Sequence, residues 1–256
     1  MKQANPSSET MPASKHLAEL RNRLIKIFLI LLTGTAIAGI YSKEIFGLLE
    51  EPLARNFTAG TKFIALSPLE GWIVYLKVAF VTSIFFSAPL WLYQVWAFLT
   101  PALIKREQAV IIAVAAVSSI FFIGGGFFCY FAVLPTGFRY LLEVYSSTDV
   151  TMLPQMQWYL SFILRTLFAF GIVFETPLFM MLLARLGLVS SQKMRRTRKY
   201  AVVGIFIFAA VMTPGPDVFS QVSLALPLIL FYELGIWASF FAEKKCKGAV
   251  VSSGTI

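Results

Sequence analysis

Long apolar runs constrain the fold of this chain more than any other feature of its sequence. A helix that crosses a bilayer needs about 20 mostly apolar residues. Only 14% of the 256 residues are charged, against about 25% in an average soluble domain. We therefore expect one all-α integral membrane domain rather than a soluble enzyme. Six apolar runs supply the candidate spans, at residues 24–41, 72–99, 109–134, 158–186, 200–212 and 222–241.

The lengths of these runs predict bends in two of the helices. The second and fourth runs are longer than a bilayer needs, and they contain Pro89 and Pro177. Proline removes a helical hydrogen bond and tends to kink the helix. The fifth run has about 13 residues, or roughly 20 Å of helix, so its length alone is compatible with either a span or a re-entrant segment. We count it as a span, which makes six.

The distribution of positive charge predicts the orientation. Of the 22 Lys and Arg residues, sixteen lie in the N-terminal stretch, the second-to-third and fourth-to-fifth connections, and the C-terminal tail. Four lie in the alternate connections, and Lys77 and Arg165 lie inside runs. The positive-inside rule then places both termini in the cytoplasm. We expect a polar tail over residues 1–14, a six-span domain over 15–241 and a cytoplasmic tail over 242–256.

The inventory of reactive side chains argues against metal and redox chemistry. The chain has one histidine, and its two cysteines, Cys129 and Cys246, lie in very different surroundings. Neither a metal cluster nor a disulfide framework is indicated, and we expect no cofactor. The formal net charge is +9, but the basic segment 193–199 lies directly beside two spans. Such segments contact anionic lipid, so we expect contact with membrane lipids and not with nucleic acid.

Carboxylates inside a bilayer are costly and mark candidate functional sites. Glu175 lies deep in the fourth run, beside the helix-breaking Pro177, and Glu233 lies about a dozen residues into the sixth run. Each carboxyl could instead tie helices together through hydrogen bonds, and both interpretations stay open. Lys77 and Arg165 lie near the outer ends of their runs, where long side chains can reach the interface.

Two further acids stand on the strongly positive cytoplasmic face. Glu19 belongs to residues 16–24, whose leucine spacing predicts a short amphipathic helix lying against the membrane. Glu19 could simply pair with Arg23, four residues on, and Glu107 could likewise pair with its basic neighbours. Acids on a positive face would nonetheless suit a cationic ligand, such as an arginine-bearing peptide, because a guanidinium pairs bidentately with a carboxylate.

Four sequence blocks carry a more specific signal. The blocks are His16-Leu17-x-Glu19-Leu20-Arg21-x-Arg23-Leu24, then Pro89-x-x-x-Tyr93-Gln94-x-Trp96-x-Phe98-x-x-Pro101-Ala102-Leu103-x-x-x-Glu107, then Phe170-Gly171-x-x-Phe174-Glu175-x-Pro177, and finally Thr213-Pro214-x-Pro216-Asp217-x-x-Ser220-Gln221-x-x-x-Ala225-x-Pro227-x-x-x-x-Tyr232-Glu233. In this order and at this six-span spacing, they resemble the TatC family of the twin-arginine protein translocase. Together the blocks cover about Lys15 to Phe241.

This resemblance implies a concave, glove-like fold of six helices in the bacterial inner membrane. It implies a receptor that binds the twin-arginine signal peptides of folded precursor proteins, without covalent chemistry. The expected partners are single-span TatA- and TatB-type subunits, with which the receptor exports precursors at the expense of the proton-motive force. The resemblance also implies a homo-oligomer within a larger complex.

The resemblance also assigns roles to individual residues of this chain. Signal-peptide binding is expected at Glu19, Glu107, Phe98, Arg21 and Gln94. The intramembrane cavity is expected to contain Glu175 and Glu233. Partner spans are expected to dock at Gln221, Thr213 and Asp217. Arg165 departs from the family pattern in the fourth span.

Two other function classes compete with this interpretation. A proton- or ion-coupled transporter of a small solute would use Glu175, Glu233 and the proline-broken spans. That class usually shows inverted repeats, and the first three and last three runs show no convincing similarity to each other. An intramembrane enzyme has less support, because the sequence contains no Gly-x-Gly-Asp pair, Ser–His arrangement or metal cluster.

Overall fold

The computed structural model describes residues 13–54, 63–99, 108–146, 153–212 and 218–253. Within these ranges the regular elements are helical, apart from an isolated bridge between Ile64 and Gln155. The helices are α1 (Ala13–Ile40), α2 (Ser42–Ala54), α3 (Glu70–Phe86), α4 (Ala88–Leu99), α5 (Gln108–Phe128), a π-helical turn (Cys129–Val133), α6 (Leu134–Ser146), α7 (Met156–Phe174), α8 (Thr176–Arg185), α9 (Ser191–Arg196), α10 (Arg198–Met212) and α11 (Val218–Ser253).

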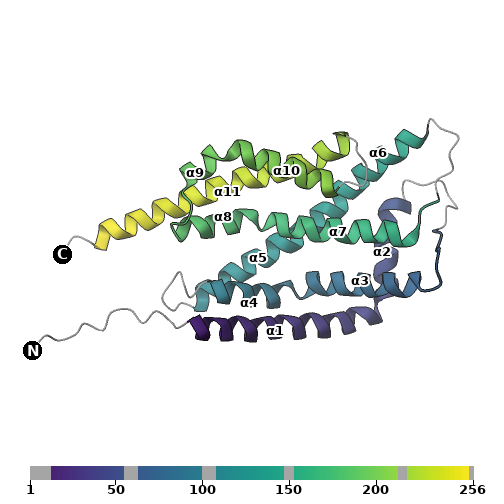
Figure 1. Cartoon of the computed structure of the whole chain (residues 1–256), viewed down its shortest axis with the longest axis horizontal. Helices are drawn as coiled ribbons and strands as arrows, with labels where there is room; N and C mark the ends of the chain where they lie inside the picture. Colours follow the sequence, from purple (N-terminus) through teal and green to yellow (C-terminus); the bar gives the residue numbers. More distant parts are fainter. Residues whose placement is uncertain (1–12, 55–62, 100–107, 147–152, 213–217, 254–256) are drawn as a thin grey trace, which may run out of the picture.

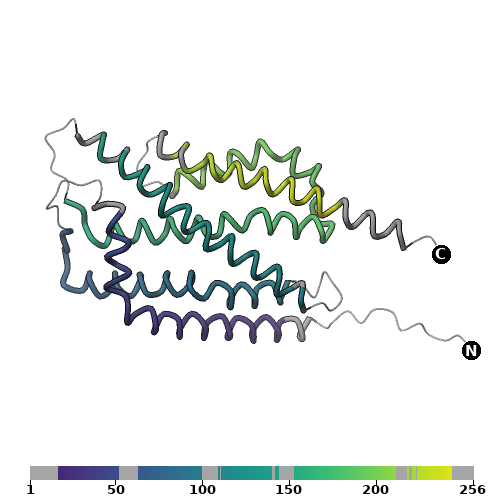
Figure 2. The backbone as a smooth tube through the Cα atoms, turned by 180° about the vertical axis from the view of Figure 1, so that it is seen from behind, coloured from purple at the N-terminus to yellow at the C-terminus, as the bar shows by residue number. Residues whose placement is uncertain are grey.

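The long helices lie side by side along the longest axis of the molecule, and α5 crosses them obliquely (Figure 1). Figure 2 shows the same arrangement from behind, with α2 turning across the end of the bundle where α1 finishes. The first turn of α1 and the last turn of α11 lie at the opposite end (Figure 1). We call this the terminal end of the bundle, and the end at which α3 and α7 begin the far end.

The lengths and compositions of the helices support most of the expected spans. Four segments are long and apolar enough to cross a membrane, and the bent pair α3 and α4 makes a fifth if it is one span. Helix α10 has only 15 residues, about 22 Å of helix, which is shorter than a bilayer core of about 30 Å. That α10 spans the membrane stays a prediction. The four segments are Leu17–Ile40, Ile111–Arg139, Met156–Arg185 and Leu224–Glu243.

The structure confirms the predicted bend in the second run, whereas the fourth run is interrupted at a single residue and continues as one span over Met156–Arg185. Helices α3 and α4 are separated at Ser87 and bend by 61°. The Ser87 hydroxyl donates to the Ser83 carbonyl oxygen at 2.6 Å, and the Ser87 N–H donates to the same oxygen at 2.9 Å. Helices α7 and α8 are separated at Glu175, two residues before Pro177. Proline lacks the N–H that would continue the hydrogen-bond ladder, so each break follows from the local sequence.

Helix α1 corrects one expectation. Residues 16–24 were predicted to form a separate amphipathic helix on the membrane face, but they are the first turns of a continuous helix that runs to Ile40. No proline or glycine interrupts residues 15–33, so nothing in the local sequence ends the helix between the two parts. Three helices that were not predicted, α2, α6 and α9, lie in connections between the apolar runs, with α6 starting at the last residue of the third run.

Glycines allow α5 and α7 to approach closely in the core. A Cβ atom on Gly125 would lie 2.7 Å from the Phe170 carbonyl oxygen, and one on Gly171 would lie 2.8 Å from the Phe122 ring. Phe122 is fully buried. Small residues at such contacts let helix backbones pack against each other in a membrane, where van der Waals contact drives association. The contact also sets α5 against the part of α7 that leads to Glu175.

Replacing Gly125 with Val should therefore disrupt the α5–α7 contact. The added side chain meets a backbone oxygen that cannot move aside, so we expect the free energy of unfolding to fall by about 1–3 kcal/mol, as for other overpacked cores. Thermal unfolding of the purified chain in detergent, followed by size-exclusion chromatography, measures the effect. Gly124→Val is the matched control, because a Cβ on Gly124 has no neighbour within 4 Å. Equal melting temperatures for the two variants would contradict the packing account.

A buried acid ties together the segments at the far end. Glu70, at 1% exposure, accepts hydrogen bonds from the backbone N–H groups of Leu66 and Gln157, both at 2.7 Å. The Ile64 N–H also donates to the Pro154 carbonyl at 3.1 Å. Hydrogen-bonded carboxylates of this kind satisfy backbone donors that would otherwise be buried and unpaired. The starts of α3 and α7 are thereby held next to each other.

Candidate functional site

Glu175 is held by a chain of hydrogen bonds that joins three helices. The Ser118 hydroxyl of α5 donates to Glu175 Oε2 at 2.6 Å, and the Trp96 indole Nε1 of α4 donates to the same hydroxyl oxygen at 2.9 Å. The side chains of Trp96 and Ser118 are buried. We call these three residues the Glu175 relay.

The second carboxylate oxygen of Glu175 is in a different position. Within the described part of the chain, Oε1 is buried and has no hydrogen-bond partner. Leaving a buried polar atom unpaired costs about 1–3 kcal/mol, and in native proteins such an atom usually contacts water or an ion or serves a function. The residue also sits at the junction between α7 and α8. This oxygen is therefore a candidate contact for water, a proton or a ligand.

Sequence reasoning found Glu175 but missed its partners. Trp96 belongs to a block that resembled a family, yet no role was assigned to it, and Ser118 was not singled out. The available signal was the pair Ser118-Ser119 inside an otherwise apolar run, because hydroxyl side chains in a span often bond across helices. Trp96 and Ser118 meet at one carboxylate only because of the way α4, α5 and α7 pack, and this packing cannot be deduced from the sequence.

A second polar constellation joins α1 to α4. Arg23 donates to Glu19 Oε1 from Nε at 3.0 Å and from Nη2 at 2.7 Å, and its Nη1 lies 3.4 Å from Gln94 Oε1. The pairing of Glu19 with Arg23 that the spacing allowed is thus present. The side chains stay accessible, at 34% exposure for Glu19 and 22% for Arg23. Two of the expected signal-peptide residues, Glu19 and Gln94, are brought together around one guanidinium.

The remaining residues of that expected site are less closely connected. Phe98 is half-buried and lies one helical turn beyond Gln94 on α4. Arg21 is exposed and lines a separate shallow hollow of about 410 Å³ on α1, with Leu17 and Phe28 among its neighbours. Glu107 lies outside the described residues.

Glu233 has a different partner from Glu175. The Arg198 guanidinium at the start of α10 binds it bidentately, with Nε 2.7 Å from Oε1 and Nη2 2.7 Å from Oε2. This contact connects α10 to α11. It agrees with the structural alternative considered for Glu233 from the sequence, in which the carboxylate holds helices together. The carboxylates of Glu175 and Glu233 are not joined by a hydrogen bond within the described ranges.

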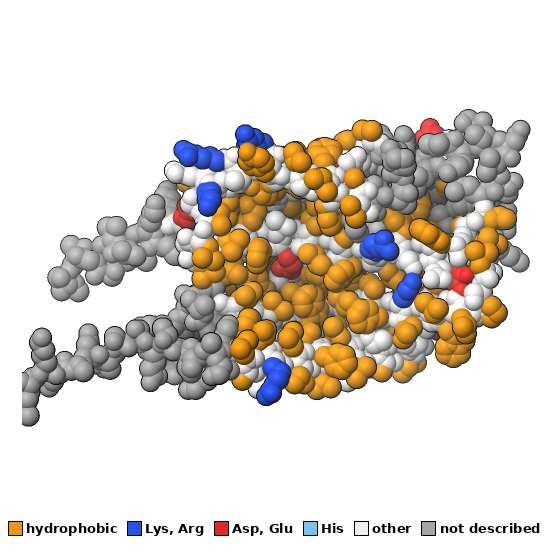
Figure 3. Space-filling model, in the orientation of Figure 1, with side chains coloured by type: hydrophobic (Ala, Val, Ile, Leu, Met, Phe, Trp, Pro, Cys, Tyr) orange, Lys and Arg blue, Asp and Glu red, His pale blue; other side chains and the backbone are white. Residues whose placement is uncertain are grey.

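Gln221 also connects α10 and α11. Its side-chain Nε2 donates to the Phe206 carbonyl oxygen at 2.9 Å. The other two expected docking residues, Thr213 and Asp217, lie outside the described residues. The face of the molecule drawn in Figure 3 is mostly hydrophobic, with isolated charged side chains between the apolar ones.

The ion pair between Arg198 and Glu233 should contribute little stability. Its side chains are 49% and 33% exposed, Arg198 belongs to the basic segment 193–199 outside the apolar runs, and ion pairs that face water are usually worth about 0.2–1 kcal/mol. We expect a coupling energy in that range from a double-mutant cycle of Arg198→Gln and Glu233→Gln, measured by thermal unfolding in detergent. A coupling energy above about 2 kcal/mol would instead indicate a desolvated pair.

The described residues contain no group of three or more His, Cys, Asp or Glu side chains that could hold a metal ion. What the described groups can do is accept hydrogen bonds and attract cations. The accessible acid Glu19 can bind a guanidinium, and the half-buried acid Glu175 has one carboxylate oxygen without a hydrogen-bond partner among the described residues.

Comparison with known proteins identifies close relatives over most of the chain. The family model described as "Sec-independent protein translocase protein (TatC)" matches residues 15–227. The protein of that name from Desulforapulum autotrophicum is 38% identical over 238 residues, covering 93% of this chain and 87% of the relative. Its counterpart from Escherichia coli (strain K12) is 35% identical over 238 residues, covering 91% and 90%.

Solved structures show the same relationship. A crystal structure of the twin-arginine translocase receptor TatC matches with a TM-score of 0.79 at 34% identity, covering 89% of this chain and 99% of that one. A second, of the receptor in DDM, matches with a TM-score of 0.80 at 34% identity, covering 88% and 99%.

Proposed function

This chain belongs to the TatC family of Sec-independent protein translocase proteins, and from that premise we propose that it is the subunit that binds twin-arginine signal peptides. As a family member it is a protein-transport component, with helices apolar enough to span a membrane. We further propose six spans, α10 included, in a bacterial inner membrane, with both termini in the cytoplasm.

The observation that carries the proposal is the guanidinium contact on α1. Glu19 already binds the Arg23 guanidinium through two hydrogen bonds, with Gln94 of α4 beside it. An arginine of a signal peptide presents the same planar group, which a carboxylate binds bidentately. The contact is accessible and lies toward the terminal end of the bundle, where α1 begins. Glu107 would supply the second carboxylate for the second arginine, and Phe98 and Arg21 would complete the surface.

We place a later step of transport at the Glu175 relay. Its unpaired Oε1 at the break between α7 and α8 can take a new partner, and the relay would then transmit a change to α4 and α5. Single-span partners of the TatA and TatB type would dock at α10 and α11, at Gln221, Thr213 and Asp217. The comparisons favour this translocase function over the solute transporter that the sequence also allowed.

Export of a folded protein tests the proposal as a whole. The full chain is expressed in bacteria that lack their own TatC, together with partner subunits from a close relative. We expect a folded fluorescent reporter with a twin-arginine signal to reach the periplasm, and tagged chain to copurify with the single-span partners. Copurification without export, or export of a reporter whose two arginines are replaced by alanine, would contradict a role as the signal receptor.

A further inference from the structure

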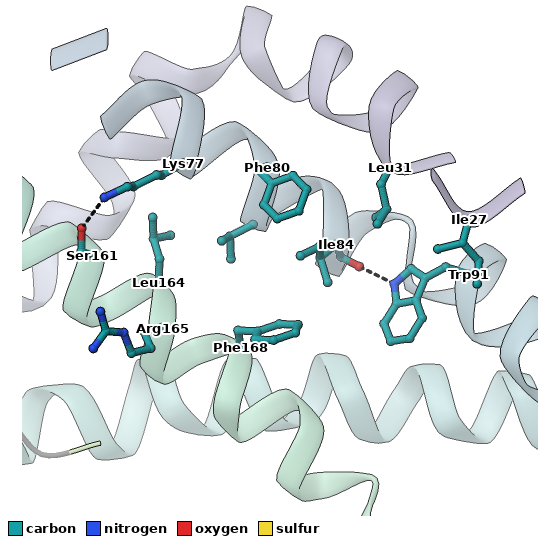
Figure 4. Close-up of a pocket in the computed structure, with 11 residues that line it drawn as sticks. Ile27, Leu31, Lys77, Phe80, Ile84, Trp91, Ser161, Leu164, Arg165 and Phe168 are labelled. Atoms are coloured by element: carbon teal, nitrogen blue, oxygen red, sulfur yellow. Dashed lines mark hydrogen bonds between the residues drawn. The ribbon is translucent and has the colours of Figure 1, made fainter. Parts of the chain in front are cut away.

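A lateral groove of about 530 Å³ lies between α1, α3, α4 and α7. Most of its lining is apolar, and the apolar side chains follow one another along its length (Figure 4). The Trp91 indole does not offer its N–H to the groove, because Nε1 donates to the Ile84 carbonyl oxygen at 2.9 Å. The apolar lining comes chiefly from Ile27, Leu31, Phe80, Ile84, Trp91 and Phe168.

Both cations of the groove lie at one end of it. Figure 4 shows Lys77 of α3 and Arg165 of α7 on the same side, away from Trp91 and Ile27. Lys77 Nζ donates to the Ser161 hydroxyl at 3.0 Å, and Arg165 follows Ser161 by one helical turn. Within the described residues, neither cation is paired with a carboxylate. The groove therefore has a positive end and an apolar body.

The direction of the helices places this positive end toward one membrane surface. Side chains of a helix lean toward its N-terminus, and α3 and α7 both begin at the far end of the bundle. The two cationic heads thus point toward the interface at that end, as expected for long basic side chains near the ends of spans. Two adjacent positive charges without an acid still favour a bound anion.

We propose that this groove binds an anionic phospholipid, with its phosphate between Lys77 and Arg165 and an acyl chain along the apolar body. The polar groups stand only at one end, which matches a molecule with one charged head and a long apolar tail. Basic pockets between spanning helices bind such headgroups. A helix carrying an acid fits less well, because both cations lie at one end of the groove and the rest of its lining is apolar except for Ser161.

A photoreactive lipid tests the proposal on the full chain. The chain is placed in phosphatidylcholine nanodiscs with a minor fraction of phosphatidylglycerol that carries a diazirine in its acyl chain, and labelled peptides are mapped by mass spectrometry. We expect label at Phe168 and Ile84. The paired change Lys77→Gln and Arg165→Gln should weaken labelling there by about thirtyfold. This is the loss of affinity expected when the usual binding free energy of two basic residues toward anionic lipid is removed.

The matched control removes two exposed cations on α2 and α6, with Lys43→Gln and Arg139→Gln, and should leave the labelling unchanged. A third variant, Val81→Trp, keeps both cations but fills the groove with a larger side chain. We expect this variant to abolish labelling. Excess inorganic phosphate should not compete, because the acyl chain supplies part of the affinity. Equal labelling by a phosphatidylcholine probe, competition by phosphate alone, or displacement by an acidic transmembrane peptide at equimolar concentration would overturn the proposal. None of these readouts depends on signal-peptide binding.

Discussion

Glu175→Gln should block export of a folded twin-arginine reporter while leaving signal-peptide binding within about twofold. Glutamine keeps the size of the side chain and can still accept the hydrogen bond from Ser118. It replaces the unpaired acceptor Oε1 by a donor, and it cannot carry a charge or take up a proton. A hydrogen bond to a charged group contributes about 1.5–3 kcal/mol, so loss of the contact proposed for Oε1 during transport should lower export at least about tenfold.

Two assays on the same variant test this separation of roles. Export is measured by fractionation of cells that contain the full complex, and binding is measured with a labelled signal peptide and the purified chain. Glu44→Gln, an exposed acid on α2, is the control for loss of one negative charge. Ser118→Ala should reduce export as well, because it removes the hydrogen bond that holds Oε2. Equal losses in export and binding, or no loss in either, would contradict the role given to the Glu175 relay.

The second large effect concerns the two acids expected to recognise arginine. Each of Glu19→Gln and Glu107→Gln should weaken binding of a twin-arginine peptide by about tenfold or more, because a hydrogen bond to a charged group contributes about 1.5–3 kcal/mol. The double variant should lose at least about a hundredfold. Fluorescence anisotropy with the chain in nanodiscs measures the affinities, and wild-type binding should weaken as salt is added.

Melting temperatures show whether these variants lose peptide affinity because recognition is lost or because the chain is less stably folded. Glu19 is accessible and pairs with Arg23 within one helix, so its replacement should cost only a few tenths of a kcal/mol in stability. Melting temperatures close to wild type are therefore expected. An unchanged affinity in the double variant would remove both acids from the proposed site.

The apolar runs predicted most of the helices because the requirement for about 20 apolar residues acts locally. The breaks at Ser87 and Glu175 were equally predictable, since the effects of Pro89 and Pro177 reach only a few residues along the chain. The short helix α2 was not predicted, because its 13 residues lie in a connection that lacks a long apolar run.

The contacts within the candidate sites could not be predicted in the same way. Lys77 and Arg165 were each interpreted as reaching outward alone, yet α3 and α7 place them at the same end of one groove. In the Glu175 relay, similarly, Trp96 and Ser118 come from two other helices. Residues so far apart in sequence meet only through tertiary packing, which periodicity and charge counting do not report. The pairing of Glu19 with Arg23 was foreseeable because helical spacing alone determines it.

Binding of signal peptides with altered arginines to the purified full chain tests the central claim most directly. One peptide carries the arginine pair and the other carries two lysines, and each is titrated against wild type and against the Glu19→Gln, Glu107→Gln double variant. Because lysine cannot pair bidentately, we predict at least about tenfold tighter binding of the arginine peptide to wild type, with the preference lost in the double variant. Equal affinities of wild type for both peptides, or a preference that persists in the double variant, would contradict the account.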